Sequence, residues 1–316
     1  MQLSLIRALL GILLMLFSAT MLVPVGFALW YSELTAAVFI ESFAITFVTG
    51  LILWLPNRSP DGQLRARDGF LITALFWVVL GVFGALPLYL SDALSLSATD
   101  AIFESVSGLT TTGATVITGL DNLPKSLLYY RQQLQWLGGI GIIVIAIAIL
   151  PMLGIGGMQL YRAETPGPMK DNKLTPRITG TAKALFTIYI SMTFACALCY
   201  WLAGMSPFDA LSHSFSTIAI GGFSTHDASM GFFNSTLILW IGIVFMLLAA
   251  ANFGLHFFAF RDRSLKPYLK DSELHFFYFS TAISTVLVCT ILLGRDYIEP
   301  FFSHSDLSPE LSLIHI

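Results

Sequence analysis

The sequence predicts an all-α protein that crosses a membrane several times and contains an internal repeat. The first observation is composition: the 316 residues are 56% hydrophobic and 11% charged, whereas an ordinary soluble domain carries about 25% charged residues. The second is that apolar runs of about 20 residues, the length that crosses the hydrocarbon as a helix, recur along the chain. The third is a pair of shorter, similar segments between these runs.

The apolar runs set the expected spans and their orientation. The runs long enough to cross lie at 8–30, 36–55, 70–90, 131–154, 182–203, 235–260 and 273–293. Two stretches near 98–116 and 207–225 are too short to cross and are rich in Gly, Thr and Ser. If neither short stretch crosses and the N-terminus is cytoplasmic, every Lys and Arg except Lys125, Arg131 and Arg295 lies on the cytoplasmic side. This bias predicts a multi-pass membrane protein with a cytoplasmic N-terminus.

The two short stretches are copies of one pattern. Residues 97–115 and 206–224 align at a constant shift of 109. The identical pairs are Ser97/Ser206, Asp100/Asp209, Ala101/Ala210, Ser105/Ser214, Ser107/Ser216 and Gly113/Gly222. Both segments begin with Ser-x-x-Asp, which satisfies free amides at a helix start. Each repeat therefore reads as a span, a short helix entering from outside, a glycine-containing strand returning outward, and a second span.

This arrangement indicates cation passage. An even number of crossings per unit makes the repeats parallel, related by an axis along the membrane normal. The C-terminal end of each short helix, with a partial negative charge, points at the membrane centre. The segments after it, Thr110–Thr115 and Ala219–Ser224, can present backbone carbonyls as potassium filters do, and Gly113 and Gly222 are expected to adopt angles that other residues avoid. No pair of ionisable residues suggests acid–base catalysis, so we expect no enzyme.

Four segments carry a resemblance to a known family. They are FESVSGLTTTGAT (103–115), QWLGGIGIIV (135–144), HSFSTIAIGGFSTHDAS (213–229) and ANFGLHFF (251–258). With them the chain, from residue 1 to about 302, resembles the membrane subunit of Trk-type potassium uptake systems of the bacterial inner membrane, in the Trk/Ktr/HKT superfamily. The resemblance implies four repeats around one pore, preceded by an extra helix pair. Two filters are present here, so we expect an incomplete pseudo-fourfold ring and a C-terminally truncated chain.

The resemblance also implies the ion-binding residues. The expected filter consists of Thr111, Thr112 and Gly113 with Ile220, Gly221 and Gly222, and K⁺ would contact Thr111, Thr112, Ile220 and Gly221. The residues expected to flank the filter are Thr110, Ala114, Ala219 and Phe223. In plant relatives a serine in place of the first filter glycine goes with sodium preference, so Gly113 favours potassium.

The expected partners come from the same resemblance. It implies a homodimer and a cytoplasmic, nucleotide-binding regulatory ring under the pore, besides membrane lipid. K⁺ is the transported ion, and no organic cofactor or nucleic acid is expected. Whether transport is a gated channel process or symport with protons or sodium stays open.

The expected domain organisation follows the repeats. The boundaries are 1–60 for the extra helix pair, 61–160 for the first repeat, 161–265 for the second, 266–310 for the start of a third, and 311–316 for a tail. That tail, LSLIHI, matches the translation of a transposase adapter used in sequencing libraries, and we expect it to be artefactual. Two alternatives are a two-repeat channel that dimerises to complete the pore, and a non-conducting membrane scaffold.

Other polar and small residues are given structural roles. Gly138 and Gly139 in GGIG are expected to allow close helix packing. His213 occupies the position of Glu104 in the first repeat and is expected to pack or face the pore. His226 and Asp227 are expected to be solvated at the outer rim, where negative charge could concentrate cations.

Overall fold

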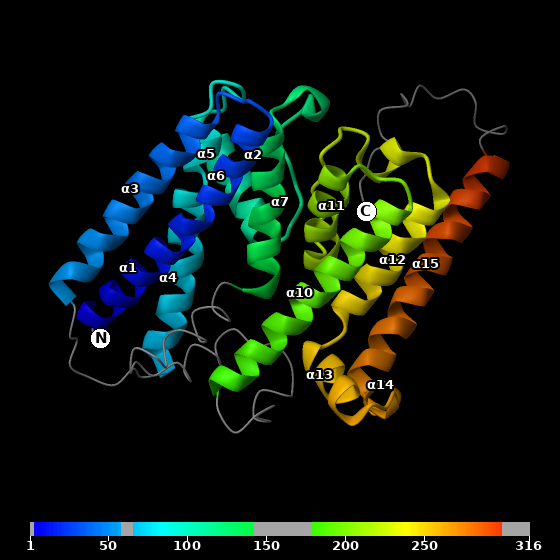
Figure 1. Cartoon of the computed structure of the whole chain (residues 1–316). Helices are drawn as coiled ribbons and strands as arrows, with labels where there is room; N and C mark the ends of the chain where they lie inside the picture. Colours follow the sequence, from blue (N-terminus) through cyan, green and yellow to red (C-terminus); the bar gives the residue numbers. More distant parts are fainter. Residues whose placement is uncertain (1–2, 58–65, 142–177, 299–316) are drawn as a thin grey trace. The chain divides into compact units, whose positions relative to one another are not determined.

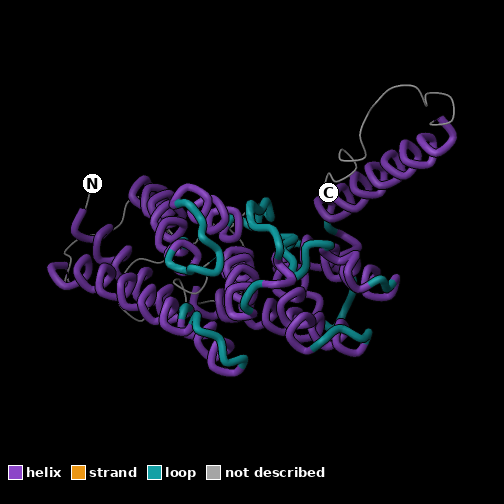
Figure 2. The backbone as a smooth tube through the Cα atoms, turned by 90° about the horizontal axis from the view of Figure 1, so that it is seen from above, coloured by secondary structure: helices purple, strands orange, loops and turns teal. Residues whose placement is uncertain are grey.

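Every regular element in the described residues is a helix. The computed structural model describes residues 3–57, 66–141 and 178–298. The α-helices, in chain order, are α1 (Leu3–Thr20), α2 (Leu22–Trp30), α3 (Ala36–Trp54), α4 (Ala66–Gly84), α5 (Leu86–Tyr89), α6 (Ala98–Leu109), α7 (Lys125–Ile140), α10 (Ile178–Leu202), α11 (Pro207–Ala219), α12 (Thr236–Ala250), α13 (Phe253–Asp262), α14 (Lys266–Lys270) and α15 (Ser272–Ile298). Short 3-10 helices lie at Leu55–Asn57, Leu120–Asn122 and Ser229–Phe233. Figures 1 and 2 show this helical arrangement, and the predicted all-α class is confirmed.

Five helical segments in the described ranges are long and apolar enough to cross a membrane. They are Leu3–Trp30, Ala36–Trp54, Leu71–Tyr89, Lys183–Leu202 and Ser272–Leu292. Each coincides with a predicted run. The predicted span 131–154 begins within α7, but its part beyond residue 141 lies outside the described residues. These segments fit a multi-pass membrane protein.

The predicted span 235–260 is not one straight helix, because its residues form α12 and α13, which are bent by 91° at a short break. Helix α12 ends at Ala250, Ala251 has an extended backbone (φ −69°, ψ 144°), and α13 begins at Phe253. The Asn252 side chain accepts a hydrogen bond from the backbone N–H of Gly254 (2.9 Å) and so caps the new helix. Hydropathy is continuous across this break, so a window average could not detect it.

The chain divides into two compact units. The first ends at Phe257 and the second begins at Phe258. The described part of the second unit contains α14 and α15, and the carboxylate of Asp271 accepts a hydrogen bond from the backbone N–H of Leu274 (2.7 Å) at the start of α15. The proposed site lies entirely in the first unit.

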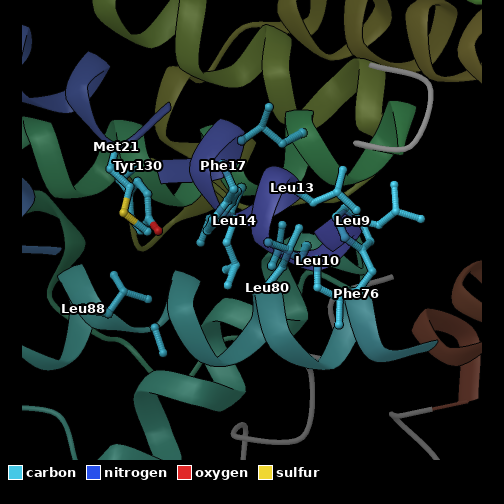
Figure 3. Close-up of a cluster of buried hydrophobic side chains, with 14 of the residues drawn as sticks. Leu9, Leu10, Leu13, Leu14, Phe17, Met21, Phe76, Leu80, Leu88 and Tyr130 are labelled. Carbon is cyan, nitrogen blue, oxygen red and sulfur yellow. The ribbon is translucent and has the colours of Figure 1, made fainter. Parts of the chain in front are cut away.

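The N-terminal helices form a dense apolar core. Figure 3 shows Leu9, Leu13 and Phe17 of α1 among side chains of α4 that include Phe76 and Leu80, and all five are almost fully buried. Helix α1 also packs on α3 through glycine, because an ideal Cβ on Gly11 would stand 2.6 Å from the carbonyl oxygen of Gly50. Such close approach of small residues is how helices associate where lipid removes the hydrophobic driving force.

The two repeats meet along α7 and α11. Helix α7 packs against α6 of its own repeat and against α11 of the next, as Figure 1 shows. The Phe215 ring of α11 lies between two aromatic residues of α7: its centroid is 5.0 Å from that of Trp136 and 5.7 Å from that of Tyr129. Large apolar side chains such as Phe194 of α10 (70% exposed) and Trp240 of α12 (60% exposed) face outward, as expected for a surface in lipid.

Candidate functional site

The short helices α6 and α11 begin in the same way. The hydroxyl of Ser97 accepts a hydrogen bond from the backbone N–H of Asp100 (3.2 Å), and Ser206 accepts one from Asp209 (3.1 Å). Each serine hydroxyl also donates to the carboxylate of the same aspartate (2.7 Å in both). Pro207 opens α11, where its missing N–H has no cost. The predicted capping of both helices is confirmed.

Both helices also end in the same turn, a Schellman motif. In this turn two amides beyond the helix donate back to carbonyls of its last turn. The bonds are Thr111 N–H to Gly108 O (3.0 Å), Thr112 N–H to Ser107 O (2.9 Å), Ile220 N–H to Thr217 O (3.1 Å) and Gly221 N–H to Ser216 O (2.8 Å). Since each bond in one repeat matches one in the other at the shift of 109, the sequence repeat is also a backbone repeat.

Left-handed backbone angles recur at matched positions after each helix. Gly113 has φ +77° and Gly222 φ +82°, so the predicted need for glycine is confirmed at both. Two residues earlier, Thr111 (φ 55°) and Ile220 (φ 54°) are also left-handed. Both are β-branched, and such residues at positive φ are genuine outliers that cluster at functional sites. Sequence reasoning missed them because helix ends of this type usually carry glycine.

The segments Thr110–Thr115 and Ala219–Ser224, here called the first and second filter loops, lie directly against each other. An ideal Cβ on Gly113 would overlap the carbonyl oxygen of Gly221 and stand 3.1 Å from its carbonyl carbon. The same Cβ would stand 3.7 Å from the Cα of Gly222, so the structure brings the two predicted glycines, Gly113 and Gly222, together. Neither loop pairs with another strand in the described residues, so the predicted returning strand is an irregular extended segment.

The predicted filter residues differ in their exposure. Thr112, Ile220 and Gly222 are exposed, Thr111 and Gly113 are half-buried, and Gly221 is buried. Among the flanking residues, Thr110 and Ala114 are exposed, while Ala219 and Phe223 are buried. The first filter loop is tied to its own helix, because the Ser107 hydroxyl donates to the carbonyl of Ala114 (2.6 Å). This bond turns the Ala114 carbonyl toward α6.

The second filter loop is held from behind by α7. The side-chain oxygen of Gln135 accepts a hydrogen bond from the backbone N–H of Phe223 (3.1 Å). An ideal Cβ on Gly221 would lie 2.6 Å from the same oxygen, so glycine is needed for this approach. Gln135 lies on α7 of the first repeat, so the contact couples that repeat to the second filter loop.

A buried ion pair lies between the two loops. Arg131 of α7 and Glu104 of α6 are 1% and 0% exposed, and the Nε of Arg131 donates to Oε1 of Glu104 (2.8 Å). The hydroxyl of Thr115 donates to Glu104 (2.9 Å), and the backbone N–H of Val116 donates to its other oxygen (3.1 Å). Sequence analysis left Arg131 without a role, because nothing in the local pattern links it to a carboxylate 27 residues away.

The second repeat uses a histidine at the matching position. His213 of α11 is 1% exposed. Its Nδ1 lies 3.0 Å from the carbonyl of Asp209 and its Nε2 lies 3.0 Å from the hydroxyl of Ser224. A neutral ring with its proton on Nδ1 donates to the carbonyl and accepts from the hydroxyl. The expected packing role of His213 is thus what its contacts show.

The expectation of a solvated rim residue is wrong for His226, whose side chain is 16% exposed, whereas Asp227 is exposed as expected. The Nδ1 of His226 pairs with Asp121, and its Nε2 lies 3.4 Å from Asp209. Its ring stacks on Phe232 with centroids 3.5 Å apart. Asp227 accepts a hydrogen bond from the backbone N–H of Gly119 (2.9 Å). These contacts link the segments that follow the two filter loops.

This link predicts a pH dependence of stability. The hydrogen bond from His226 holds the pKa of Asp121 below its ordinary value of 3.8. Because the pKa is lowered in the folded state, the stabilisation is fully present above the ordinary value and is lost as pH falls through the lowered one. We expect the thermal midpoint of the detergent-solubilised protein to fall more between about pH 5 and pH 3 than that of His226→Phe.

The phenylalanine keeps a ring for stacking on Phe232 and removes both ring nitrogens. Unfolding followed by intrinsic fluorescence measures the two midpoints. Parallel pH profiles for the two proteins would contradict the prediction.

Comparison with known proteins places these features in a family. The model of the TrkH family, described as cation transport protein, matches residues 35–295. The Trk system potassium uptake protein TrkH of Vibrio parahaemolyticus is 57% identical over 305 residues, which are 95% of this chain and 63% of that protein. The protein of the same name in Escherichia coli K12 is 54% identical over 288 residues, 91% of this chain and 59% of that protein.

A solved structure agrees. The crystal structure of the potassium transporter TrkH from Vibrio parahaemolyticus matches with a TM-score of 0.81 at 52% identity, covering 95% of this chain and 62% of that one. The chain therefore spans about three fifths of the length of the relatives it matches.

Proposed function

The chain belongs to the TrkH family of cation transport proteins, and from this premise we propose that it forms part of a pore for potassium uptake. The observation that carries the proposal is the meeting of two filter loops with the same backbone turn, Gly113 of one against Gly221 of the other. Each loop follows the C-terminal end of a short helix, which attracts a cation. The relatives are named for potassium uptake. The two loops contain no charged side chain, which suits a filter that binds K⁺ through backbone carbonyls.

The proposed ion contacts are backbone carbonyls. Rings of carbonyl oxygens replace the hydration shell of K⁺ in known filters. We assign the contacts to Thr111 and Thr112 in the first loop and Ile220 and Gly221 in the second, with Gly113 and Gly222 supplying the required angles. The strained angles of Thr111 and Ile220 support this assignment, since such strain persists where the surrounding structure enforces it.

Two loops surround an ion only in part. We propose that the complete pore contains further filter loops, contributed either by additional sequence of the same gene product or by a second copy of the chain. The greater length of the relatives favours the first source. Transport then needs no covalent chemistry and follows the electrochemical gradient, alone or coupled to another ion.

Location and partners are part of the same proposal. The excess of Lys and Arg on one side supports a cytoplasmic N-terminus in a bacterial inner membrane. The relatives are named as parts of a Trk system, which supports assembly with other components. We propose a homodimer above a cytoplasmic nucleotide-binding ring.

Complementation of potassium-uptake-deficient bacteria on low-potassium medium tests the proposal. The complete product of the gene is expected to restore growth. Gly222→Ser should reduce potassium uptake about tenfold, because left-handed angles cost a residue with a Cβ about 1–2 kcal/mol. Gly204→Ser is the matched control: Gly204 has φ +106° and, like Gly222, nothing within 4 Å of an added Cβ, but it lies before α11.

The outcomes separate the alternatives. Growth with Gly204→Ser and not with Gly222→Ser supports the filter. Rescue by residues 1–316 alone would mean that copies of this chain complete the ring. Failure of the complete product to restore growth or uptake, although it reaches the membrane, would overturn potassium transport in favour of a non-conducting role.

A further inference from the structure

A single buried guanidinium connects the two filter loops. The Nη2 of Arg131 donates to the hydroxyl of Thr115 at the end of the first loop (3.0 Å). Its Nη1 donates to the backbone carbonyl of Ser224 at the end of the second loop (3.1 Å). Its Nε donates to Glu104 on α6 (2.8 Å). Three nitrogens of one rigid group thus contact three separate segments.

The plane of this group is also held. The guanidinium carbon lies 4.4 Å from the ring centroid of Phe223, inside the range of a cation–π contact. Phe223 itself is 2% exposed, and its backbone N–H is bound by Gln135. Glu104 is equally constrained, since its two oxygens accept from three donors. Neither charged group has room to reorient.

Anchoring a filter loop to its short helix does not require a charge. In the second repeat the neutral pair His213 and Ser224 makes the bond that Glu104 and Thr115 make in the first. At the shift of 109 the counterpart of Arg131 is Trp240, which is 60% exposed and contributes nothing equivalent. Burying two charges is costly and often gives no net stability over apolar packing. The ion pair therefore needs an explanation beyond anchoring.

We infer that Arg131 is a positioning residue that sets the spacing between the two filter loops, and through it the discrimination between K⁺ and Na⁺. This inference rests on the proposed function. Carbonyls of two loops can coordinate one ion only at a spacing suited to its radius. Arg131 joins the end of one loop to the end of the other across two hydrogen bonds, while Glu104 neutralises its charge so that the ion is not repelled.

Arginine is suited to this task and lysine is not. The guanidinium presents donors in a planar fork, whereas an ammonium is a compact point charge on a flexible stem. Arg131→Lys keeps the charge beside Glu104 but cannot hold Thr115 and Ser224 at a fixed separation. The substitution therefore separates geometry from charge.

The test measures transport by the complete gene product in proteoliposomes. The variants are Arg131→Lys, Arg131→Gln, Glu104→Gln and Thr115→Val, each checked for monodispersity before reconstitution. The readouts are the KM for K⁺ and the inhibition of K⁺ uptake by Na⁺. Lys125→Gln is the control, because Lys125 lies on the same helix and is exposed, over the ring of Tyr31.

We expect Arg131→Lys and Arg131→Gln to lower the preference for K⁺ over Na⁺ about tenfold, a change of about 1.4 kcal/mol. Thr115→Val removes one of the two bridging bonds and should lower it less, and Lys125→Gln should leave it unchanged. If Arg131→Gln fails to fold, Arg131→Lys and Thr115→Val still decide the matter.

Two results would overturn the inference. One is unchanged ion preference in Arg131→Lys and Thr115→Val. The other is a pattern governed by charge alone, in which Arg131→Lys behaves as the parent while Glu104→Gln raises the KM for K⁺ and Arg131→Gln lowers it. A parent protein that does not transport K⁺ would instead contradict the proposed function, so the two failures are distinguishable.

Discussion

Gly113→Ser is expected to reduce potassium uptake by about tenfold or more, the largest effect of any single change in the filter loops. Two costs combine at this position. Gly113 has φ +77°, which is strained for any residue with a Cβ by about 1–2 kcal/mol. The added Cβ also overlaps the Gly221 carbonyl oxygen, and because that atom belongs to the backbone, no side-chain rotation relieves the clash. The two loops must separate, and carbonyls from both leave their positions.

Gly119→Ser is the control for the backbone cost alone. Gly119 has φ +74° in the segment after the first filter loop, and an added Cβ there meets nothing within 4 Å. Uptake of K⁺ and of Na⁺ by the complete gene product, measured for both variants, separates strain from collision. Equal uptake by the two serine variants would show that contact between the loops is unimportant. A gain of Na⁺ uptake in Gly113→Ser alone would match the sodium preference implied by serine-containing plant relatives.

Gly138→Ala is expected to destabilise the protein although alanine favours helices. Helix propensity alone would raise the free energy of unfolding by about 0.8–1 kcal/mol. However, an ideal Cβ on Gly138 overlaps the carbonyl oxygen of Leu109 and stands 2.7 Å from its carbonyl carbon, at the end of α6. Overpacking costs typically about 1–3 kcal/mol, and a backbone collision lies at the upper end. We expect a net loss of about 2 kcal/mol, a lower thermal midpoint in detergent and reduced K⁺ uptake.

Gly26→Ala provides the matched control. Gly26 lies in α2 with nothing within 4 Å of an added Cβ, so only the propensity term remains and the midpoint should rise slightly. The neighbouring Gly139 contacts the second repeat in the same manner, since its Cβ would stand 2.8 Å from the Cα of Ala219 at the end of α11. Gly139→Ala should therefore resemble Gly138→Ala. A midpoint for Gly138→Ala at or above that of the parent would contradict this account of the packing.

Through these two glycines α7 packs closely against the C-terminal ends of both short helices, α6 and α11. Close packing at Gly138 and Gly139 was predicted from the GGIG motif, and it is confirmed. The motif did not indicate that each glycine touches a different repeat. That partition follows from the crossing of α7 with α6 and α11, a property of the assembled helices.

Much of the site could be predicted because its determinants are local. The caps at Ser97 and Ser206 need only an aspartate three residues further on. Glycine at positions 113 and 222 predicts positive φ by itself, because glycine lacks a Cβ. By contrast, Thr111 and Ile220 are held at left-handed angles against their own preference. Intrinsic propensity gives the wrong expectation there, because the hydrogen bonds that close α6 and α11 outweigh it.

The sequence by itself determined the helical class, the five described helical segments long and apolar enough to cross a membrane, the repeat at a shift of 109 and the two loops with their glycines. These depend on residue periodicity and on neighbours within a few positions, so pattern alone reveals them. Only the tertiary structure decided that Arg131 joins Glu104 and Ser224, that His226 pairs with Asp121, and that the span 235–260 breaks before Phe253. The pairings join residues 27 to 105 positions apart. A buried charge or polar group is costly unless it is paired, and its partner is whichever group helix packing places beside it. Which partner that is depends on how helices pack in space, which no local pattern records.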